Sequence, residues 1–231
     1  MRTIGLIGGM SWESSAEYYR LINSLVKERL GGLHSAKSVM ISVDFAEIET
    51  LQREGRWEEA AQSLIAAAQS LQRAGAELVL LCTNTMHKVA ADIGASIQVP
   101  FLHIADATAE AIKAQGLTTV GLLGTRFTME QDFYVGRLTQ DHGLQVLIPE
   151  PAEREMIHRV IYDELVLGDV RASSKAQYLA VIDRLIAHGA QGIILGCTEI
   201  GLLIRADDCR APVFDTTRLH AQAAIAWALA V

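Results

Sequence analysis

Two cysteines follow strand-like apolar runs, where a thiol could accept and return a proton. Cys82 ends one run and Cys197 ends the other, and a threonine follows each of them. The halves that contain them open with similar segments, residues 3–8 and 119–124, so that 79 residues separate positions 3 and 82 and 78 separate positions 119 and 197. This spacing predicts equivalent thiols in a duplicated chain. Two thiols that face each other across a cleft suit the removal of a proton from one face of a carbon and its return to the other face.

A single cysteine that ends an apolar strand is more often a core residue, because free cysteine is among the most buried residue types. Two cysteines in matching repeat positions, each followed by threonine, favour a functional role instead. Cys209 lies in a polar segment and has no counterpart in the other half. We therefore interpret Cys209 as incidental.

Strand-like and helix-like segments alternate along the chain, which predicts parallel sheets covered by helices. The clearest predicted helices span residues 14–30, 58–74 and 175–188, and the clearest predicted strands span residues 39–43, 78–82 and 192–196. Capping-box spacing of Ser14 and Glu17 marks the start of the first helix. The repeat predicts an α/β fold of two pseudo-symmetric, flavodoxin-like parallel-sheet domains with the active site in the cleft between them. The expected boundaries are 1–115 plus 215–231 for the first domain and 116–214 for the second.

The composition indicates a cytoplasmic protein with an ordinary core. Half of the 231 residues are hydrophobic, and the net charge of −7 argues against nucleic acid as a partner, because phosphates require a basic surface. We find no signal-peptide pattern and no apolar run long enough to span a bilayer, so no membrane partner is expected. The three cysteines lack CxxC spacing and the seven histidines lack metal-ligand spacing. We therefore expect reduced thiols and no metal site.

The carboxyl ends of the strands are the expected ligand-binding edge, as in other doubly wound sheets. A helix that begins after each cysteine would stabilise a thiolate and attract a carboxylate, and Thr83 and Thr198 add hydroxyl donors. The glycine-rich stretch 5–11 matches neither a dinucleotide nor a phosphate-loop pattern. It is equally well interpreted as a ligand-binding loop or as a tight turn that needs glycine. Thr125 lies in its counterpart in the second half and is expected to face the cleft.

His87 lies five residues after Cys82, which is compatible with the base of a Cys–His hydrolase. The sequence gives no sign of the further group that would orient such a base. We favour the interpretation of His87 as an ordinary helix residue.

Three segments together resemble one protein family. Residues 8–14 read Gly-Gly-Met-Ser-Trp-Glu-Ser, residues 82–87 read Cys-Thr-Asn-Thr-Met-His, and residues 196–200 read Gly-Cys-Thr-Glu-Ile. With the internal repeat, they resemble the cofactor-independent aspartate/glutamate racemase family over essentially the whole chain. The resemblance is strongest to its bacterial branch of aspartate/glutamate or broad-specificity amino-acid racemases.

The resemblance implies two similar α/β domains, a small amino-acid substrate, no pyridoxal phosphate or other cofactor, and a homodimer. It implies that Cys82 and Cys197 are the acid/base thiols. It also implies a set of residues that contact the substrate: Met10, Thr83, Asn84, Thr85, Thr198 and Glu199.

One stretch departs from the family pattern. Members that act on acidic substrates carry a basic residue in the loop after the second strand, where it holds the distal carboxylate. Here Gln52 takes that place, with Arg53 beside it, and residues 161–164 offer no lysine. Gln52 is thus either a less charge-selective substrate anchor or a solvated loop residue. Strict aspartate specificity is not expected, which leaves glutamate, homoserine and other polar amino acids as substrates.

The sequence therefore predicts an amino-acid racemase that acts on aspartate, glutamate or other polar amino acids by two-thiol proton transfer at the α-carbon. One alternative keeps the fold and changes the reaction to that of a maleate-type isomerase or a hydantoin racemase. Another alternative is a small-molecule-binding or redox sensor protein without turnover.

Overall fold

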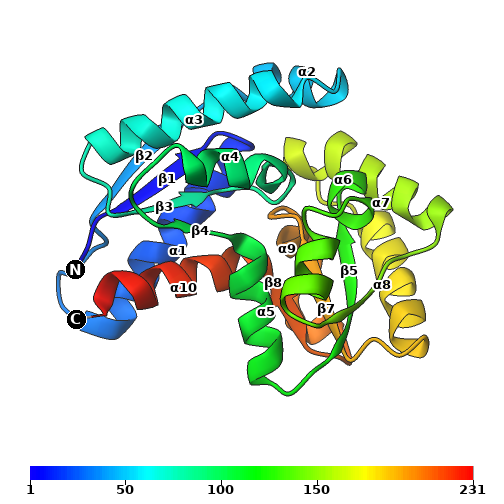
Figure 1. Cartoon of the computed structure of the whole chain (residues 1–231). Coiled ribbons are helices and arrows are strands. Elements are labelled where there is room, and N and C mark those ends of the chain that lie inside the picture. The colour runs from blue at the N-terminus through cyan, green and yellow to red at the C-terminus, as the bar shows by residue number, and fades with distance from the viewer. Residues whose placement is uncertain (231) are drawn as a thin grey trace. The chain divides into compact units, whose positions relative to one another are not determined.

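The computed structural model describes residues 1–230, which form two parallel sheets, each covered by helices (Figure 1). The chain divides into a first unit, made of Met1–His103 and the segment from His220, and a second unit, Ile104–Leu219. The two-domain α/β prediction is confirmed. The boundaries differ from the expected 1–115 plus 215–231 and 116–214, because helix α5 (Ile104–Ala114) and residues 215–219 belong to the second unit. The apolar face of α5, with Ile104 and Ile112, packs in the core of that unit.

The first unit contains a four-stranded sheet in the order β2-β1-β3-β4, with all pairs parallel. Its strands are β1 (Ile4–Gly8), β2 (Ser38–Ser42), β3 (Leu78–Leu81) and β4 (Phe101–Leu102). Its helices are α1 (Trp12–Leu30), α2 (Phe45–Arg53), α3 (Trp57–Arg73), the 3-10 helix η1 (Thr85–Val89), α4 (Ala90–Ala95) and most of α10 (Thr216–Leu229).

Every residue of β3 is buried, because helices cover both faces of the sheet. Leu78 and Leu80 pack with residues of α1 and α10 on one face. Val79 and Leu81 pack with residues of α3 on the other face (Figure 1). This two-sided burial explains the uninterrupted apolar run in the sequence.

The second unit repeats the same sheet order as β6-β5-β7-β8, again with parallel pairs. Its strands are β5 (Thr119–Gly124), β6 (Gln145–Leu147), β7 (Gly192–Gly196) and β8 (Val213–Asp215). Besides α5, its helical elements are α6 (Arg126–Glu130), the π-helical turn η2 (Arg137–Asp141), α7 (Pro151–Asp163), η3 (Leu165–Leu167), α8 (Ala172–Ala187), α9 (Ile200–Leu203) and η4 (Ala206–Asp208).

The first helix begins earlier than the sequence pattern predicted. Its N-cap is Ser11, whose hydroxyl accepts a hydrogen bond from the Ser14 backbone N–H, so Ser14 lies inside the first turn. The helix ends as predicted, at Gly31, whose positive φ of 70° favours glycine.

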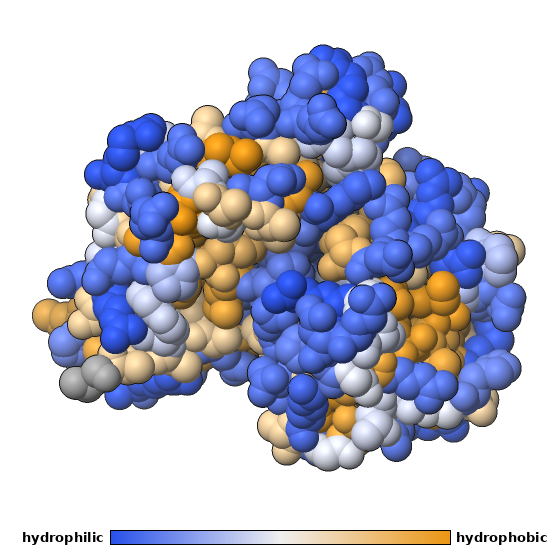
Figure 2. All heavy atoms as spheres, viewed as in Figure 1, coloured by the Kyte–Doolittle hydropathy of each residue, from blue (hydrophilic) through white to orange (hydrophobic). Residues whose placement is uncertain are grey.

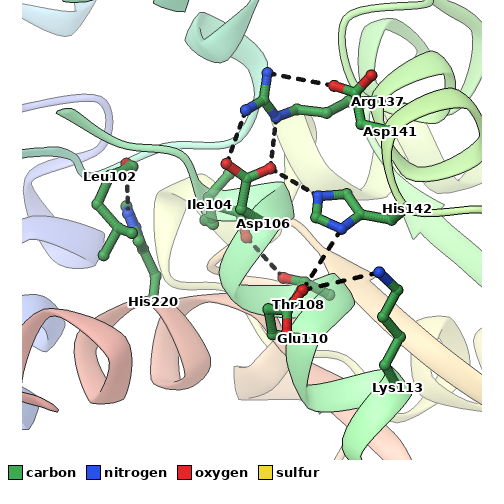
Figure 3. Close-up of polar contacts among 10 residues, drawn as sticks. All are labelled: Leu102, Ile104, Asp106, Thr108, Glu110, Lys113, Arg137, Asp141, His142 and His220. Atoms are coloured by element: carbon green, nitrogen blue, oxygen red, sulfur yellow. Dashed lines mark hydrogen bonds and ion pairs between the residues drawn. The ribbon is translucent and has the colours of Figure 1, made fainter.

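A network of charged side chains joins α5 to η2 within the second unit (Figure 3). The guanidinium of Arg137 contacts both carboxylate oxygens of Asp106, at 2.6 and 2.8 Å, and His142 Nε2 lies 2.9 Å from Oδ1 of the same carboxylate. Burial alone would raise the pKa of Asp106. The hydrogen bonds from Arg137 and His142 outweigh this effect, so the pKa of Asp106 lies below its ordinary value.

Polar side chains cover much of the surface in view, with smaller apolar patches between them (Figure 2). Within residues 1–230, no helix combines the length and the apolar character that a membrane crossing requires.

Candidate active site

The first unit gathers polar side chains just beyond the end of β3. Thr83, Asn84 and Thr85 follow the strand directly and are all buried. Met10, which follows β1, is 4% exposed and contributes to the core on one face of the sheet. Because β1 and β3 are neighbours in a parallel sheet, these segments share its carboxyl-end edge. This is the edge at which doubly wound folds bind ligands.

The glycine before Met10 is required by the backbone. Gly9 has a φ of 99°, and a Cβ at this position would collide with the backbone of Val43. The tight-turn interpretation of this glycine-rich stretch is therefore supported by the geometry. The same turn carries Met10 to the end of the sheet.

Gln52 lies on helix α2 and is 5% exposed, so it is neither on a loop nor solvated, as one of the two interpretations had it. Its side-chain Nε2 lies 2.9 Å from the sulfur of Met86 in η1. This contact brings the amide of Gln52 next to the helical turn that contains Thr85. Gln52 is thus buried against Met86, the residue that follows Thr85.

In the second unit, Cys197 forms a polar cluster with the two residues that follow it. The Cys197 Sγ lies 2.9 Å from Glu199 Oε2, and the Thr198 hydroxyl donates to the same oxygen at 2.6 Å. Glu199 is only 5% exposed, whereas Cys197 is half-buried. The carboxylate of Glu199 therefore contacts the thiol directly, which the expected role as a substrate contact did not anticipate.

The surroundings of Cys197 favour the protonated thiol. Burial raises its pKa well above the ordinary value, and the charge of Glu199 and the hydrogen bond to its carboxylate raise it further. Backbone N–H groups of Glu199 and Ile200 act in the opposite direction and do not outweigh these effects. A thiol in this state holds its proton more firmly than an ordinary thiol, and its thiolate is a stronger base.

Thr125 is buried at the end of β5, where its hydroxyl caps helix α6. The Oγ1 atom accepts from the Thr128 backbone N–H at 3.3 Å and lies 3.1 Å from the Thr128 hydroxyl. Thr125 thus has a structural use at the edge where it was predicted. The helices that follow the two strand ends are short: η1 has five residues and α9 has four.

The strand register corrects the predicted equivalence of Cys82 and Cys197. Gly5 of β1 pairs with Val79, and Gly121, which opens the matching Gly-Leu segment of β5, pairs with Ile193. Cys82 comes three residues after Val79, and Gly196 comes three residues after Ile193, so Cys82 is equivalent to Gly196. Thr83 is then the residue equivalent to Cys197.

Two further features fix the same register. Glu77 and Gln191 occupy matching positions, because their backbone N–H groups donate to the opening threonine of each half, Thr3 and Thr119. Pro100 and Pro212 also match, since their carbonyls accept from Val79 and Ile193 respectively, an equivalent pair. The prediction that the two cysteines hold equivalent positions is therefore wrong by one residue.

The side chain of Cys82 points into the core. It is 0% exposed and packs with Leu78, Leu80 and residues of α10. Burial raises its pKa well above that of an ordinary thiol. In the second unit the equivalent Gly196 leaves no room for a side chain, since a Cβ there would lie 2.9 Å from the Leu123 carbonyl oxygen.

Sequence reasoning also missed the contacts of His87. His87 is 2% exposed in η1 and contacts two other buried histidines, His103 and His220. These three are far apart in the sequence, so spacing alone gave no signal.

The one-residue offset between the two cysteines did leave a signal in the sequence. Cys82 comes seven residues after Gly75, whereas Cys197 comes eight residues after the equivalent Gly189.

Comparison with known proteins agrees with this architecture. Residues 7–224 match the family model of Asp/Glu/hydantoin racemases. A crystal structure of a Yersinia pestis protein of this racemase type is 59% identical, with a TM-score of 0.94 and 100% of each chain covered. An aspartate racemase homologue from Pyrococcus horikoshii is 36% identical, with a TM-score of 0.86 and 99% of each chain covered.

A curated relative extends the comparison to an enzyme with a named activity. The broad specificity amino-acid racemase RacX of Bacillus subtilis is 23% identical over 180 residues, which cover 75% of this chain and 74% of RacX. The family model alone covers most of the chain. The chain belongs to the Asp/Glu/hydantoin racemase family, whose racemases are isomerases.

Proposed function

We infer that the protein racemises a polar amino acid by moving a proton at the α-carbon. The observation that carries this inference is the Cys197–Glu199 contact at the end of β7, in a chain of the racemase family. A thiol held at a strand end beside a carboxylate is a group able to exchange a proton. The reaction breaks the α-carbon–hydrogen bond, leaves a carbanion, and forms a new bond to hydrogen on the opposite face.

The carbanion must be stabilised, because an α-proton is far less acidic than a thiol. The hydroxyls of Thr83 and Thr85 and the amide of Asn84 are suited to bind the α-carboxylate and to spread the developing charge. Their burial supports this role, since hydrogen bonds are stronger where water is excluded. Thr198 is a further hydroxyl in the second unit, where it donates to Glu199.

Two groups are needed to transfer the protons, and the register supports Cys197 and Thr83 for this role. The original two-thiol hypothesis assigns the second group to Cys82, whose side chain lies in the core. A threonine hydroxyl can donate and accept hydrogen bonds but loses its proton less readily than a thiol. The proposed mechanism is therefore asymmetric, with faster proton abstraction by Cys197 than by Thr83.

The proposed substrates are aspartate, glutamate and other polar amino acids such as homoserine. Gln52 offers an uncharged amide at the position where the distal group is expected to bind, so it accommodates a carboxylate or a hydroxyl. The name of RacX as a broad specificity racemase is in keeping with this breadth. The proposed transfers use side chains of the chain without pyridoxal phosphate or metal, and the homodimer remains part of the proposal.

The test is a panel of single-enantiomer amino acids, with hydantoins included because the family model names them. Each compound is incubated with the dialysed protein, and the two enantiomers are quantified by chiral chromatography. We expect the opposite enantiomer of at least one polar amino acid to accumulate. If only hydantoins are converted, the proposed amino-acid substrate is wrong. A lack of turnover across the panel would support the alternative of a small-molecule-binding or redox sensor protein.

A further inference from the structure

Three of the seven histidines meet inside the first unit. His87, His103 and His220 are 2%, 7% and 0% exposed. The rings of His87 and His103 stand edge to face with centroids 4.5 Å apart, and His87 and His220 lie 5.9 Å apart. Burying imidazoles is costly unless their nitrogens are hydrogen-bonded, so such a cluster requires an explanation.

The contacts of His87 define which ring nitrogen carries hydrogen. Its Nδ1 lies 2.7 Å from the carbonyl oxygen of Thr83, and a carbonyl can only accept. Nδ1 is therefore a donor. This hydrogen bond holds the carbonyl of Thr83, the residue that is equivalent to Cys197 of the second unit.

His220 is fixed in the same way from the side of α10. Its Nε2 lies 3.0 Å from the carbonyl oxygen of Leu102 (Figure 3), which can only accept, so Nε2 is the donor. Its Nδ1 lies 2.8 Å from the hydroxyl of Tyr18 on α1, which donates to it when the ring is neutral. His220 therefore ties the end of β4 to α1 and α10, next to the ring of His87.

The peptide carbonyl before Thr83 also contacts a polar side chain. The Ser14 hydroxyl lies 3.1 Å from the carbonyl oxygen of Cys82, and Ser14 is 3% exposed. Two consecutive carbonyls at the end of β3 thus each contact a buried donor. Among residues 1–230, no three His, Cys, Asp or Glu side chains are arranged to hold a metal ion.

We propose that His87 is a positioning residue for the reaction, which orients Thr83 by holding its carbonyl while His103 and His220 pack against the ring. This inference rests on the proposed racemase function. Loss of the Nδ1 donor would let the Thr83–Thr85 turn shift, and a misplacement of about 1 Å can lower catalysis about 100-fold. Binding of the substrate side chain would change much less.

The experiment compares His87→Asn with His87→Gln. The amide N–H of asparagine can take the place of Nδ1–H, whereas the longer glutamine side chain presents its amide near the position of Nε2. We expect His87→Asn to retain kcat/KM within about tenfold of the parent and His87→Gln to lose about 100-fold in kcat/KM. The pH profile of kcat should keep its shape, because His87 exchanges no proton with the substrate.

His188 provides a matched control, because its Nδ1 also lies 2.7 Å from a backbone carbonyl, that of Arg184, on the exposed end of α8. His188→Gln should leave kcat unchanged. Thermal unfolding identifies variants that fail to fold. If His87→Gln fails to fold, His87→Asn alone is compared with the parent. A folded His87→Gln variant as active as the parent, or a folded His87→Asn variant as inactive as His87→Gln, would overturn the proposal. An inactive parent would instead refute the proposed function.

Discussion

At the scale of single residues, the most informative contact is that between the Cys197 thiol and the Glu199 carboxylate. The distance of 2.9 Å and the low exposure of Glu199 limit the screening of the pair by water. Glu199 thereby raises the pKa of Cys197, in addition to the effect of burial. The pKa of the thiol that we assign to proton transfer is thus raised by a carboxylate two residues later in the chain.

Replacing Glu199 with glutamine should lower the pKa of Cys197, because a neutral amide does not oppose the thiolate. The group would then ionise at a lower pH. The measurement is the rate of thiol alkylation against pH in a Cys209→Ala background, where Cys82 stays protected in the core. Cys209 is the only other thiol outside the core, since the chain has three cysteines. A titration that stays in place or moves to higher pH would show that the carboxylate does not control the thiol.

At the scale of elements, the charged network links α5 to η2 within the second unit. Asp106→Asn should lower the free energy of unfolding by roughly 1 kcal/mol at neutral pH, because the paired contacts with Arg137 lose their charge. Since the folded pKa of Asp106 is depressed, its contribution is present above the ordinary value of about 4 and is lost as pH falls through the folded value.

Urea unfolding of parent and variant at neutral and acidic pH measures this effect. The gap between them should close in acid. Asp141→Asn is the control, since Asp141 is exposed and reaches Arg137 only at 3.7 Å. A gap that persists unchanged in acid, or an equal loss from Asp141→Asn, would refute the assigned role of Asp106.

The elements also show what the sequence can and cannot predict. Helices α1, α3 and α8 were predicted to within a few residues, because long amphipathic stripes and glycine stops mark them. Helix α2 was treated as a loop, since only Ile48 and Gln52 of its nine residues are buried and the pattern is weak. The resemblance nevertheless made Gln52 a candidate substrate contact, and in the structure its buried side chain lies beside Met86.

At the scale of the whole molecule, the duplication explains why the repeated domains could be predicted from the sequence and why their register was predicted wrongly. The repeat of two parallel-sheet α/β domains was predicted correctly. The register within the repeat was not, because β3 and β7 are buried on both faces and lack the alternation that would fix it. The pairing of Gly5 with Val79 and of Gly121 with Ile193 showed that Thr83, not Cys82, matches Cys197.

The most direct test of this account measures racemisation by Cys82→Ala, Thr83→Val and Cys197→Ala, with Cys209→Ala as the control and circular dichroism to verify folding. We predict that Cys197→Ala loses all measurable racemisation and that Thr83→Val, which keeps the side-chain shape, loses at least about 100-fold, a typical value for a proton-transfer group. Cys82→Ala and Cys209→Ala should stay within about threefold of the parent. A folded Cys82→Ala variant without activity, beside an active Thr83→Val variant, would contradict this account and restore the two-thiol mechanism.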